Sequence, residues 1–209
     1  MLIAGAKGFA KEVMESYIQD HTEAEVVFFD DVSLDIDSYM FNKFPILRSK
    51  VELKDYFSNI SNEYTLGLGS PVSRKKLSDI IDEIGGKLVS TISSKSHLGQ
   101  FGIEIKEGCN LMQGVIITSN VKIGRGVLVN INSTIGHDSI IEDFVEICPG
   151  VNISGNCHIG MQTFIGTNAT ILPGIKIGAN VTIGAGSLVT KDIPDNTMAY
   201  GIPAKPISK

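Results

Sequence analysis

The chain has 209 residues, with 23 acidic and 18 basic side chains and a formal net charge of -5. This charge, together with the lack of a basic cluster, argues against nucleic acid as the main ligand. No apolar stretch reaches the roughly 20 residues that cross a bilayer, and the opening segment MLIAGAKGFAKE lacks the long apolar core of a secretory signal, so we expect a cytoplasmic protein without membrane insertion.

Residues 1–92 have the pattern of a small α/β domain. The expected strands are 2–4, 25–29, 64–68 and 88–92, and the expected helices are 11–19 and 73–84. Pro71 and Ser73 are start signals for the second helix. Strands that alternate with helices form a parallel sheet, whose ligands bind at the carboxyl ends of the strands. We therefore predict a Rossmann-like domain here.

A glycine turn joins the first expected strand to the first helix. Residues 5–10, GAKGFA, would leave amide N–H groups free at the positive end of the helix, where phosphate binds. Asp30 and Asp31 end the next strand, and their carboxylates can accept hydrogen bonds from sugar hydroxyls. The turn is not the full Gly-x-Gly-x-x-Gly fingerprint, and about 90 residues are too few for the six-stranded sheet that cradles a dinucleotide, so a redox cofactor is not expected. Packing of the helix on the strand explains the turn equally well.

From Ile105 to Val189 every sixth residue is aliphatic. A period of six matches neither the 3.6-residue turn of a helix nor a plain alternation, so the backbone must coil back on itself as a β-solenoid. A second residue, which is usually small, lies two positions before each aliphatic residue. The side chains of both would fill the interior of the solenoid. With three six-residue faces to a coil, residues 18 apart share a corner. A β-sandwich would instead show irregular loop lengths. We place the solenoid at residues 93–209.

Glycines and cysteines fit the same pattern. Several glycines directly follow the aliphatic residue, which suits tight corners or a positive φ: Gly124, Gly136, Gly160, Gly166, Gly178 and Gly184. Cys109 and Cys157 fall on the small inward positions. We interpret both as compact apolar fillers and not as catalytic thiols.

Among the four histidines, His137 is the one that packing does not explain. It lies off the inward column, and Asp138 follows it. His158 precedes an inward isoleucine and should point to solvent, while His21 and His97 lie in a polar turn and in the domain junction. Neutral imidazole, with a reference pKa near 6.5, suits removal of a proton from an attacking amine or hydroxyl.

A carboxylate on the other ring nitrogen would fix the tautomer of His137 and stabilise the imidazolium. Asp138 is the nearest in sequence, although adjacent side chains on an extended strand point apart. Asp143 and Glu146 are the alternatives. Glu146 lies half a coil from His137, so the two would meet only across protomers.

The order of these parts resembles a known family. A glycine-turn α/β domain, the segment 69–76 (GSPVSRKK) and coils that contain Gly136-His137-Asp138 resemble the sugar acetyltransferases of the sialic acid O-acetyltransferase (NeuD) and bacillosamine-pathway N-acetyltransferase (PglD) family. The resemblance covers nearly the whole chain. It implies a left-handed parallel β-helix of hexapeptide repeats, a homotrimer, and acetyl-CoA as co-substrate without a metal. It also assigns the general base to His137.

The resemblance further implies where the ligands bind. The acceptor, commonly a nucleotide-linked amino sugar used in glycan biosynthesis, would lie at Gly5, Lys7, Gly8, Phe9, Asp30, Asp31 and Gly69, with Asn130 approaching from the coils. Phe9 departs from the Gly-His-Gly or Gly-His-Ala turn of several N-acetyltransferases. It is closer to the sialic acid branch, so O-acetylation of sialic acid or another sugar is the alternative.

Acetyl-CoA would lie along the coils between protomers. By the resemblance, its contacts are the amides at Gly155, Thr167 and Ala185, with Lys205 of the tail near its adenine and phosphates. The spacing adds one observation. Gly155 lies one coil beyond His137, so the column beneath the histidine has little side-chain bulk and offers room for a thin pantetheine arm.

Two other functions fit a solenoid less well. A carbonic anhydrase would need about three histidines around one metal, but His137 and His158 are not 18 residues apart and do not share a corner. A non-catalytic scaffold would leave His137 without a task. The sequence therefore favours an acetyltransferase.

Overall fold

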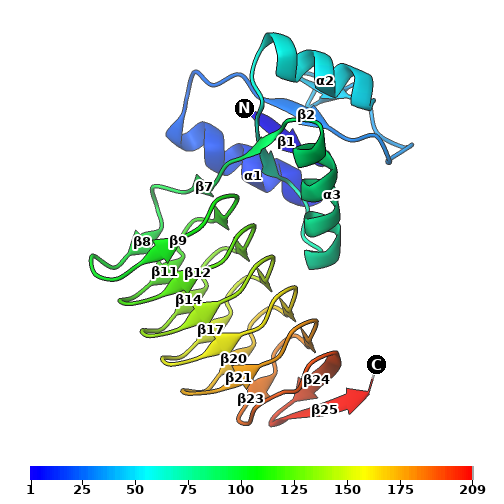
Figure 1. Ribbon diagram of the computed structural model, residues 1–209. Coiled ribbons are helices and arrows are strands. Elements are labelled where there is room, and N and C mark those ends of the chain that lie inside the picture. Colours follow the sequence, from blue (N-terminus) through cyan, green and yellow to red (C-terminus); the bar gives the residue numbers. More distant parts are fainter. Residues whose placement is uncertain (209) are drawn as a thin grey trace.

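An α/β domain sits at one end of a three-sided prism of coils in the computed structural model, which describes residues 1–208 (Figure 1). The helices of the α/β domain are α1 (Gly8–Asp20), α2 (Lys50–Asn59) and α3 (Pro71–Glu83). In the described chain no helix is long and apolar enough to span a bilayer.

The sheet of this domain has six strands. They are β1 (Leu2–Ala4), β2 (Val27–Phe29), β3 (Tyr39–Met40), β4 (Phe44–Leu47), β5 (Glu63–Leu66) and β6 (Lys87–Leu88), in the spatial order β3-β4-β2-β1-β5-β6. All neighbours are parallel except β3 and β4. The predicted parallel sheet is confirmed. Helix α2 and the β3–β4 pair were not predicted, and the expectation that about 90 residues cannot hold six strands was wrong, because these strands are only two to four residues long.

Helices cover both faces of this sheet. Alternate residues of a strand point to opposite sides, so Ile3 of β1 packs with Val13 of α1 in one buried cluster. Leu2 packs with Leu53 of α2 and Ile81 of α3 in another. The carboxyl ends of β1, β2 and β5 are thereby held against the start of α3.

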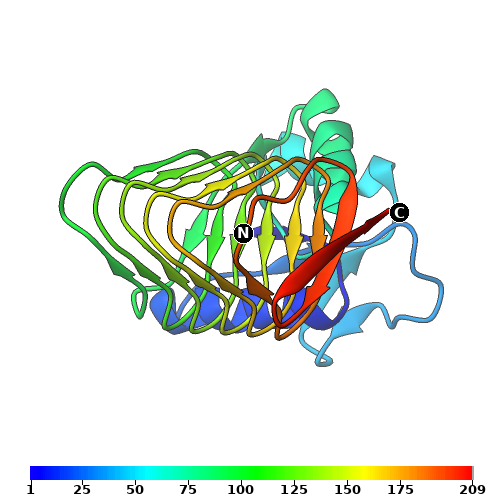
Figure 2. The same ribbon diagram turned by 90° about the horizontal axis from the view of Figure 1, so that it is seen from below.

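The prism has three sheets, numbered by chain order, in which all neighbouring strands are parallel except β24 and β25. The first face comprises β7 (Thr91–Ile92), β10 (Asn110–Leu111), β13 (Leu128–Val129), β16 (Glu146–Ile147), β19 (Phe164–Ile165), β22 (Thr182–Ile183), β24 (Thr197–Gly201) and β25 (Ala204–Ser208). The second face comprises β8 (His97–Leu98), β11 (Ile116–Ile117), β14 (Thr134–Ile135), β17 (Asn152–Ile153), β20 (Thr170–Ile171) and β23 (Leu188–Val189). The third face comprises β9 (Glu104–Ile105), β12 (Lys122–Ile123), β15 (Ile140–Ile141), β18 (His158–Ile159) and β21 (Lys176–Ile177). A corner is the turn between two faces, and each corner takes the number of the face that precedes it in the chain. Figure 2 shows the coils nested behind one another.

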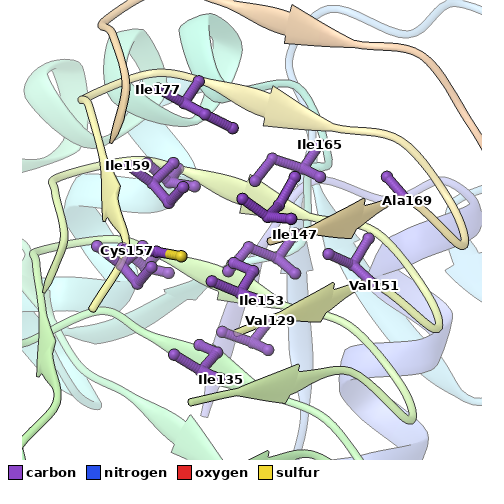
Figure 3. Packing of buried hydrophobic residues seen from close by; sticks show 14 of the residues in the cluster. Val129, Ile135, Ile147, Val151, Ile153, Cys157, Ile159, Ile165, Ala169 and Ile177 are labelled. Atoms are coloured by element: carbon purple, nitrogen blue, oxygen red, sulfur yellow. The ribbon is translucent and has the colours of Figure 1, made fainter. Parts of the chain in front are cut away.

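The predicted 18-residue coil is confirmed by the strand register. Ile135 pairs with Ile117 on one side and with Ile153 on the other. The aliphatic column is buried inside the prism, together with small residues such as Val151, Cys157 and Ala169 (Figure 3). Full burial of one aliphatic side chain is worth about 1.5–3 kcal/mol, so this column supplies much of the stability of the coils.

Each corner contains one residue in the left-handed conformation. Every sixth residue from Gly102 to Gly186 has a positive φ, and all of them are Gly, Asn or Asp except Phe144 and Gln162. These residue types tolerate that conformation best. The glycines singled out from the sequence are different ones, and the expectation of positive φ was wrong for them. A close approach explains them instead, since a Cβ at Gly136 would lie 2.5 Å from the amide nitrogen of the next coil.

The two domains share a polar junction built around Arg74 of α3. Its guanidinium is fully buried and donates to the carbonyl oxygens of Leu68 at 2.7 Å and Gly126 at 2.9 Å, and to Oδ1 of Asn110 at 3.0 Å. Burial lowers the pKa of Arg74 to about 10, which still leaves it charged at neutral pH. The first coil strand, β7, pairs with β10 of the prism, so coil stacking begins at Thr91.

Candidate functional site

His137 lies on the second corner, just after β14, and Asp138 turns back toward it. The backbone at Asp138 is left-handed, with φ 60°. This turn brings Oδ2 of Asp138 to 2.7 Å from Nδ1 of His137. The expectation that adjacent side chains point apart holds for an extended strand and was wrong here, because the pair occupies a corner.

Asp138 is itself held in place by the preceding coil. Its Oδ1 accepts a hydrogen bond of 2.6 Å from Asn120 Nδ2. This hydrogen bond, and next that of His137, lowers the pKa of Asp138. Within this chain Asp138 is therefore the carboxylate that orients the imidazole. Asp143 instead accepts from the amide of Arg125 on the third corner, and Glu146 lies on the first face.

The imidazole of His137 folds over Gly155. A Cβ at position 155 would lie 2.6 Å from Nε2. The sequence was right that this column lacks bulk; the ring takes part of that space, and contact of a pantetheine arm with Gly155 stays a prediction. The side chain of His137 is still 58% exposed, so Nε2 is open to a ligand from solvent.

The predicted acetyl-CoA contacts are spread over the prism. Gly155 is on the second corner, whereas Thr167 and Ala185 lie one above the other on the first corner. In the described chain the amides of Gly155 and Ala185 donate no backbone hydrogen bond. Lys205 is exposed on β25, in the hairpin at the far end of the prism from the α/β domain (Figure 1). One chain alone does not bring these four residues together.

A cavity of about 500 Å³ opens at the carboxyl ends of β1 and β2. It is lined by three predicted acceptor residues, Gly5, Asp30 and Asp31. It is also lined by Lys50 of α2 and Lys76 of α3, which the sequence analysis did not select. Lys76 belongs to the GSPVSRKK segment, but Lys50 lay in a stretch where no helix was expected.

Gly5 and Asp30 shape this cavity. Gly5 has φ 111°, and a Cβ there would lie 2.9 Å from Leu68 Cδ2. Asp30 Oδ1 accepts from the amides of Ser33 at 2.8 Å and Val32 at 3.1 Å. Burial alone would raise the pKa of Asp30, but these hydrogen bonds outweigh burial and the pKa is lowered. Asp30 thus holds its loop, while Asp31 is exposed beside it.

The rest of the glycine turn lies at the start of α1. Lys7 is the exposed N-cap, without a side-chain hydrogen bond to the helix. A Cβ at Gly8 would meet no atom within 4 Å. Phe9 is half-buried and packs on the cluster beneath α1. None of these three lines the cavity, so their predicted contacts with the acceptor stay predictions.

Gly69 and Asn130 lie apart from that cavity. A Cβ at Gly69 would lie 2.9 Å from Oε1 of Glu146. A second cavity of about 390 Å³ is lined by Glu146 and lies between the start of α3 and the first face. Asn130 is buried on the first corner and accepts a 2.7 Å hydrogen bond from the amide of Ile131. The sequence named Glu146 only as an alternative partner of His137.

The other histidines and the cysteines do not form a reactive cluster. His158 Nε2 lies 2.7 Å from Glu142 Oε1 on the outside of the prism. Burial raises the pKa of Cys109 to about 11 and that of Cys148 to about 12, which keeps both thiols protonated. Over residues 1–208, no three His, Cys, Asp or Glu side chains are grouped so as to hold a metal ion.

Sequence profiles of two families match the chain. The PglD N-terminal domain matches residues 1–81, and the bacterial transferase hexapeptide (six repeats) matches residues 156–191. The first match covers the α/β sheet up to α3. The second covers coils of the prism.

Solved structures match over both domains together. The acetyltransferase domain of PglB from Neisseria gonorrhoeae is 30% identical, with a TM-score of 0.89 over 99% of this chain and 98% of that one. WeeI from Acinetobacter baumannii is 31% identical, with a TM-score of 0.88 and the same coverage. A histidine variant of perosamine N-acetyltransferase from Caulobacter crescentus, in complex with CoA and GDP-perosamine, is 26% identical, with a TM-score of 0.89 over 100% and 96%.

These matches extend over the α/β domain, the junction and the coils, and they include the PglD N-terminal domain and the hexapeptide repeat in one chain. The prism is therefore the left-handed β-helix of hexapeptide-repeat enzymes. The chain belongs to the PglD/NeuD family of sugar acetyltransferases.

Proposed function

We propose that the protein transfers the acetyl group of acetyl-CoA to the amino group of a nucleotide-linked amino sugar, with His137 as general base. The observation that carries this proposal is the 2.7 Å contact between Nδ1 of His137 and Asp138. Because the carboxylate accepts a hydrogen bond from Nδ1–H, the neutral ring carries its proton on Nδ1 and Nε2 is the unprotonated nitrogen. A base held in this way on an exposed corner suits a reaction with a ligand that approaches from outside the prism.

The reaction follows from this geometry. The amine nitrogen attacks the thioester carbonyl while Nε2 of His137 takes its proton. The tetrahedral intermediate then releases the CoA thiolate, which recovers the proton from the imidazolium. Asp138 stabilises the imidazolium between the two steps. A free amide, such as that of Gly155, suits stabilisation of the oxyanion.

The acceptor class is supported by the cavity in the α/β domain. Lys50 and Lys76 supply positive charge for phosphates, and Asp31 supplies an acceptor for hydroxyl groups. A free monosaccharide would leave the two lysines unused. Among the relatives, perosamine N-acetyltransferase was solved with CoA and GDP-perosamine, and the PglB domain with acetyl coenzyme A.

A shared site between copies of the chain, as in the homotrimer expected from the family resemblance, completes the proposal. Gly155 lies on the second corner and Thr167 on the first, so a single acetyl-CoA contacts both only if two chains meet. His137 on the second corner is likewise across the prism from the start of α3, which packs on the first face and third corner. A cyclic assembly brings these corners together at every interface.

Release of the CoA thiol tests this function. Wild-type protein is given acetyl-CoA with GDP-perosamine, with a UDP-linked 4-amino sugar, or with free sialic acid. We expect thiol release with at least one nucleotide amino sugar and a product acetylated on nitrogen by mass spectrometry. Release with sialic acid alone would favour the O-acetyltransferase alternative. No release with any acceptor would contradict the proposal.

A further inference from the structure

Glu146 is a buried carboxylate with one oxygen left unpaired. It lies on β16 of the first face and is 8% exposed. Its Oε2 has no hydrogen-bond partner within the described chain, and its Oε1 receives only a 3.9 Å contact from the thiol of Cys148. Buried carboxylates are normally paired or hydrogen-bonded, because their desolvation is costly. Burial raises the pKa of Glu146, and Arg74 and Cys148 offset this only in part.

The fold does not use this carboxylate as a partner for Arg74. The positive charge of Arg74 acts on Glu146 through space, but its N–H groups donate elsewhere. They are directed at Leu68 and Gly126 carbonyl oxygens and at Asn110 Oδ1. The domain junction is therefore satisfied without Glu146, and the unpaired oxygen is left for another group.

The cavity of about 390 Å³ beside Glu146 has a matching chemistry. Its walls are the start of α3, with Ser70 and Pro71, and the first face, with Glu146 and Phe164. No lysine, arginine or histidine of the described chain lines it. Among the described residues that line this cavity, Glu146 alone is charged, so the cavity favours a ligand that carries a cation or a strong N–H donor.

The backbone at Gly69 makes room for the carboxylate. A Cβ at this position would lie 2.9 Å from Glu146 Oε1, and the next atoms of that carboxylate would lie within 4 Å. The same segment joins the two cavities, since Leu68 lines the larger one and Ser70 the smaller one. Segment 68–70 thus borders both cavities, and an acceptor with its phosphates near Lys76 is expected to extend along this segment toward Glu146.

We infer that Glu146 binds the amino group of the acceptor sugar and thereby selects amines over hydroxyl acceptors. The inference rests on the function proposed above and narrows it to acetylation of nitrogen. The acceptor binds as an ammonium group that donates to Oε2; it gives up one proton to solvent before the attack, and His137 takes the second as the carbon–nitrogen bond forms. A hydroxyl in the same place forms one neutral donor bond and adds no positive charge beside the carboxylate. Glu146 binds the substrate and takes no part in bond making.

The test compares the wild type with Glu146→Gln and Glu146→Asp. The amine probe is GDP-perosamine or the UDP-linked 4-amino sugar, whichever supports faster thiol release, and the matched probe carries a hydroxyl in place of the amino group. Calorimetry gives the Kd of both probes without acetyl-CoA, and thiol release gives KM and kcat. Glu142→Gln is the matched control, since Glu142 pairs with His158 outside this cavity. Thermal melting confirms that each variant is folded.

We expect the wild type to prefer the amine probe and Glu146→Gln to lose that preference, through a rise of about 10- to 100-fold in Kd for the amine. Its Kd for the hydroxyl probe and its KM for acetyl-CoA should stay within about twofold, as should all values for Glu142→Gln. Glu146→Asp, which keeps the charge, should recover part of the preference.

An unchanged preference in folded Glu146→Gln would overturn the inference while leaving the proposed function intact, because the wild type still releases thiol with the amine. A wild type that binds both probes equally would also overturn it. If the wild type releases no thiol with either nucleotide amino sugar, the proposed function fails and the inference fails with it.

Discussion

The imidazole of His137 rests on Gly155, the residue one coil further along the same corner. A Cβ at Gly155 would lie 2.6 Å from Nε2 and 2.7 Å from Cε1 of the ring. Gly155 has no positive φ, so its backbone would accept alanine. A glycine is therefore needed at this position to leave room for the imidazole ring, and not to allow a special backbone conformation.

Gly155→Ala should consequently impair catalysis without unfolding the protein. The added methyl group pushes the imidazole away from its position beside Asp138, and a displacement of about 1 Å can cost about 10²-fold in rate. We expect kcat to fall by about 10- to 100-fold, with the melting temperature nearly unchanged. Steady-state thiol release and thermal melting measure the two quantities.

Ser119→Ala is the control for this change. Ser119 lies one coil before His137 on the same corner, and its substitution adds no atom beneath the ring. Its kcat should match the wild type. A normal kcat in Gly155→Ala with a raised KM for acetyl-CoA would instead show that Gly155 contacts the coenzyme and does not position His137.

Replacement of His137 and Asp138 should separate the base from its orienting group. His137→Ala should lower kcat by a factor of about 10² to 10⁴, because no second histidine of the described chain lies on this corner. Asp138→Asn should lower kcat by at least about tenfold, since an amide does not hold the Nδ1–H tautomer as a carboxylate does. Both variants should keep the fold and the binding of acetyl-CoA, which calorimetry measures.

Rescue with free imidazole makes this prediction specific. Added imidazole should restore part of the activity of His137→Ala, because it supplies the missing base, and should have no effect on Asp138→Asn. A loss of less than about fivefold in His137→Ala would remove His137 from the role of general base.

The architecture of the coils was predictable because one rule repeats. The inward residues recur every six positions, so Ile135 and Ile153 had to share a face. The left-handed positions follow the same period, and the Asn residues among them, such as Asn120 and Asn132, mark that period in the sequence. Helix α2 was also readable, since Ser49 and Glu52 form a capping box at its start.

The site was less predictable, because it depends on a local corner conformation and on packing between segments far apart in sequence. The contact of His137 with Asp138 depends on a corner conformation that the local pattern alone did not reveal. The burial of Glu146 without a hydrogen-bond partner for Oε2 in the described chain depends on where α3 lies on the first face. No single segment carries the information that Arg74 is satisfied by other groups.

Gly8→Asp should weaken binding of the acceptor phosphates. Space around Gly8 is open to a side chain, so the fold should tolerate the substitution. A carboxylate at the start of α1 opposes the attraction of the helix N-terminus for a phosphate. We expect the KM for a nucleotide amino sugar to rise about tenfold or more, with the KM for acetyl-CoA unchanged.

Ser58→Asp adds the same charge at the end of α2, away from the cavity that Lys50 lines at its start. This control should keep both KM values. Equal KM values in Gly8→Asp and the wild type would show that the glycine turn only packs α1 against the sheet.

Mixed oligomers should reveal whether the site is shared between chains. We expect light scattering at micromolar concentration to give three times the chain mass of 22.5 kDa, and a monomer would contradict the shared site.

In a trimer, His137→Ala chains keep an intact acceptor cavity, and Gly8→Asp chains keep an intact His137. When the two variants are co-expressed with different tags, about a quarter of the interfaces combine both intact halves. At a limiting concentration of the acceptor, purified mixed trimers should therefore show thiol release that neither variant shows alone. Absence of this gain would place the base and the acceptor cavity of one active site on the same chain.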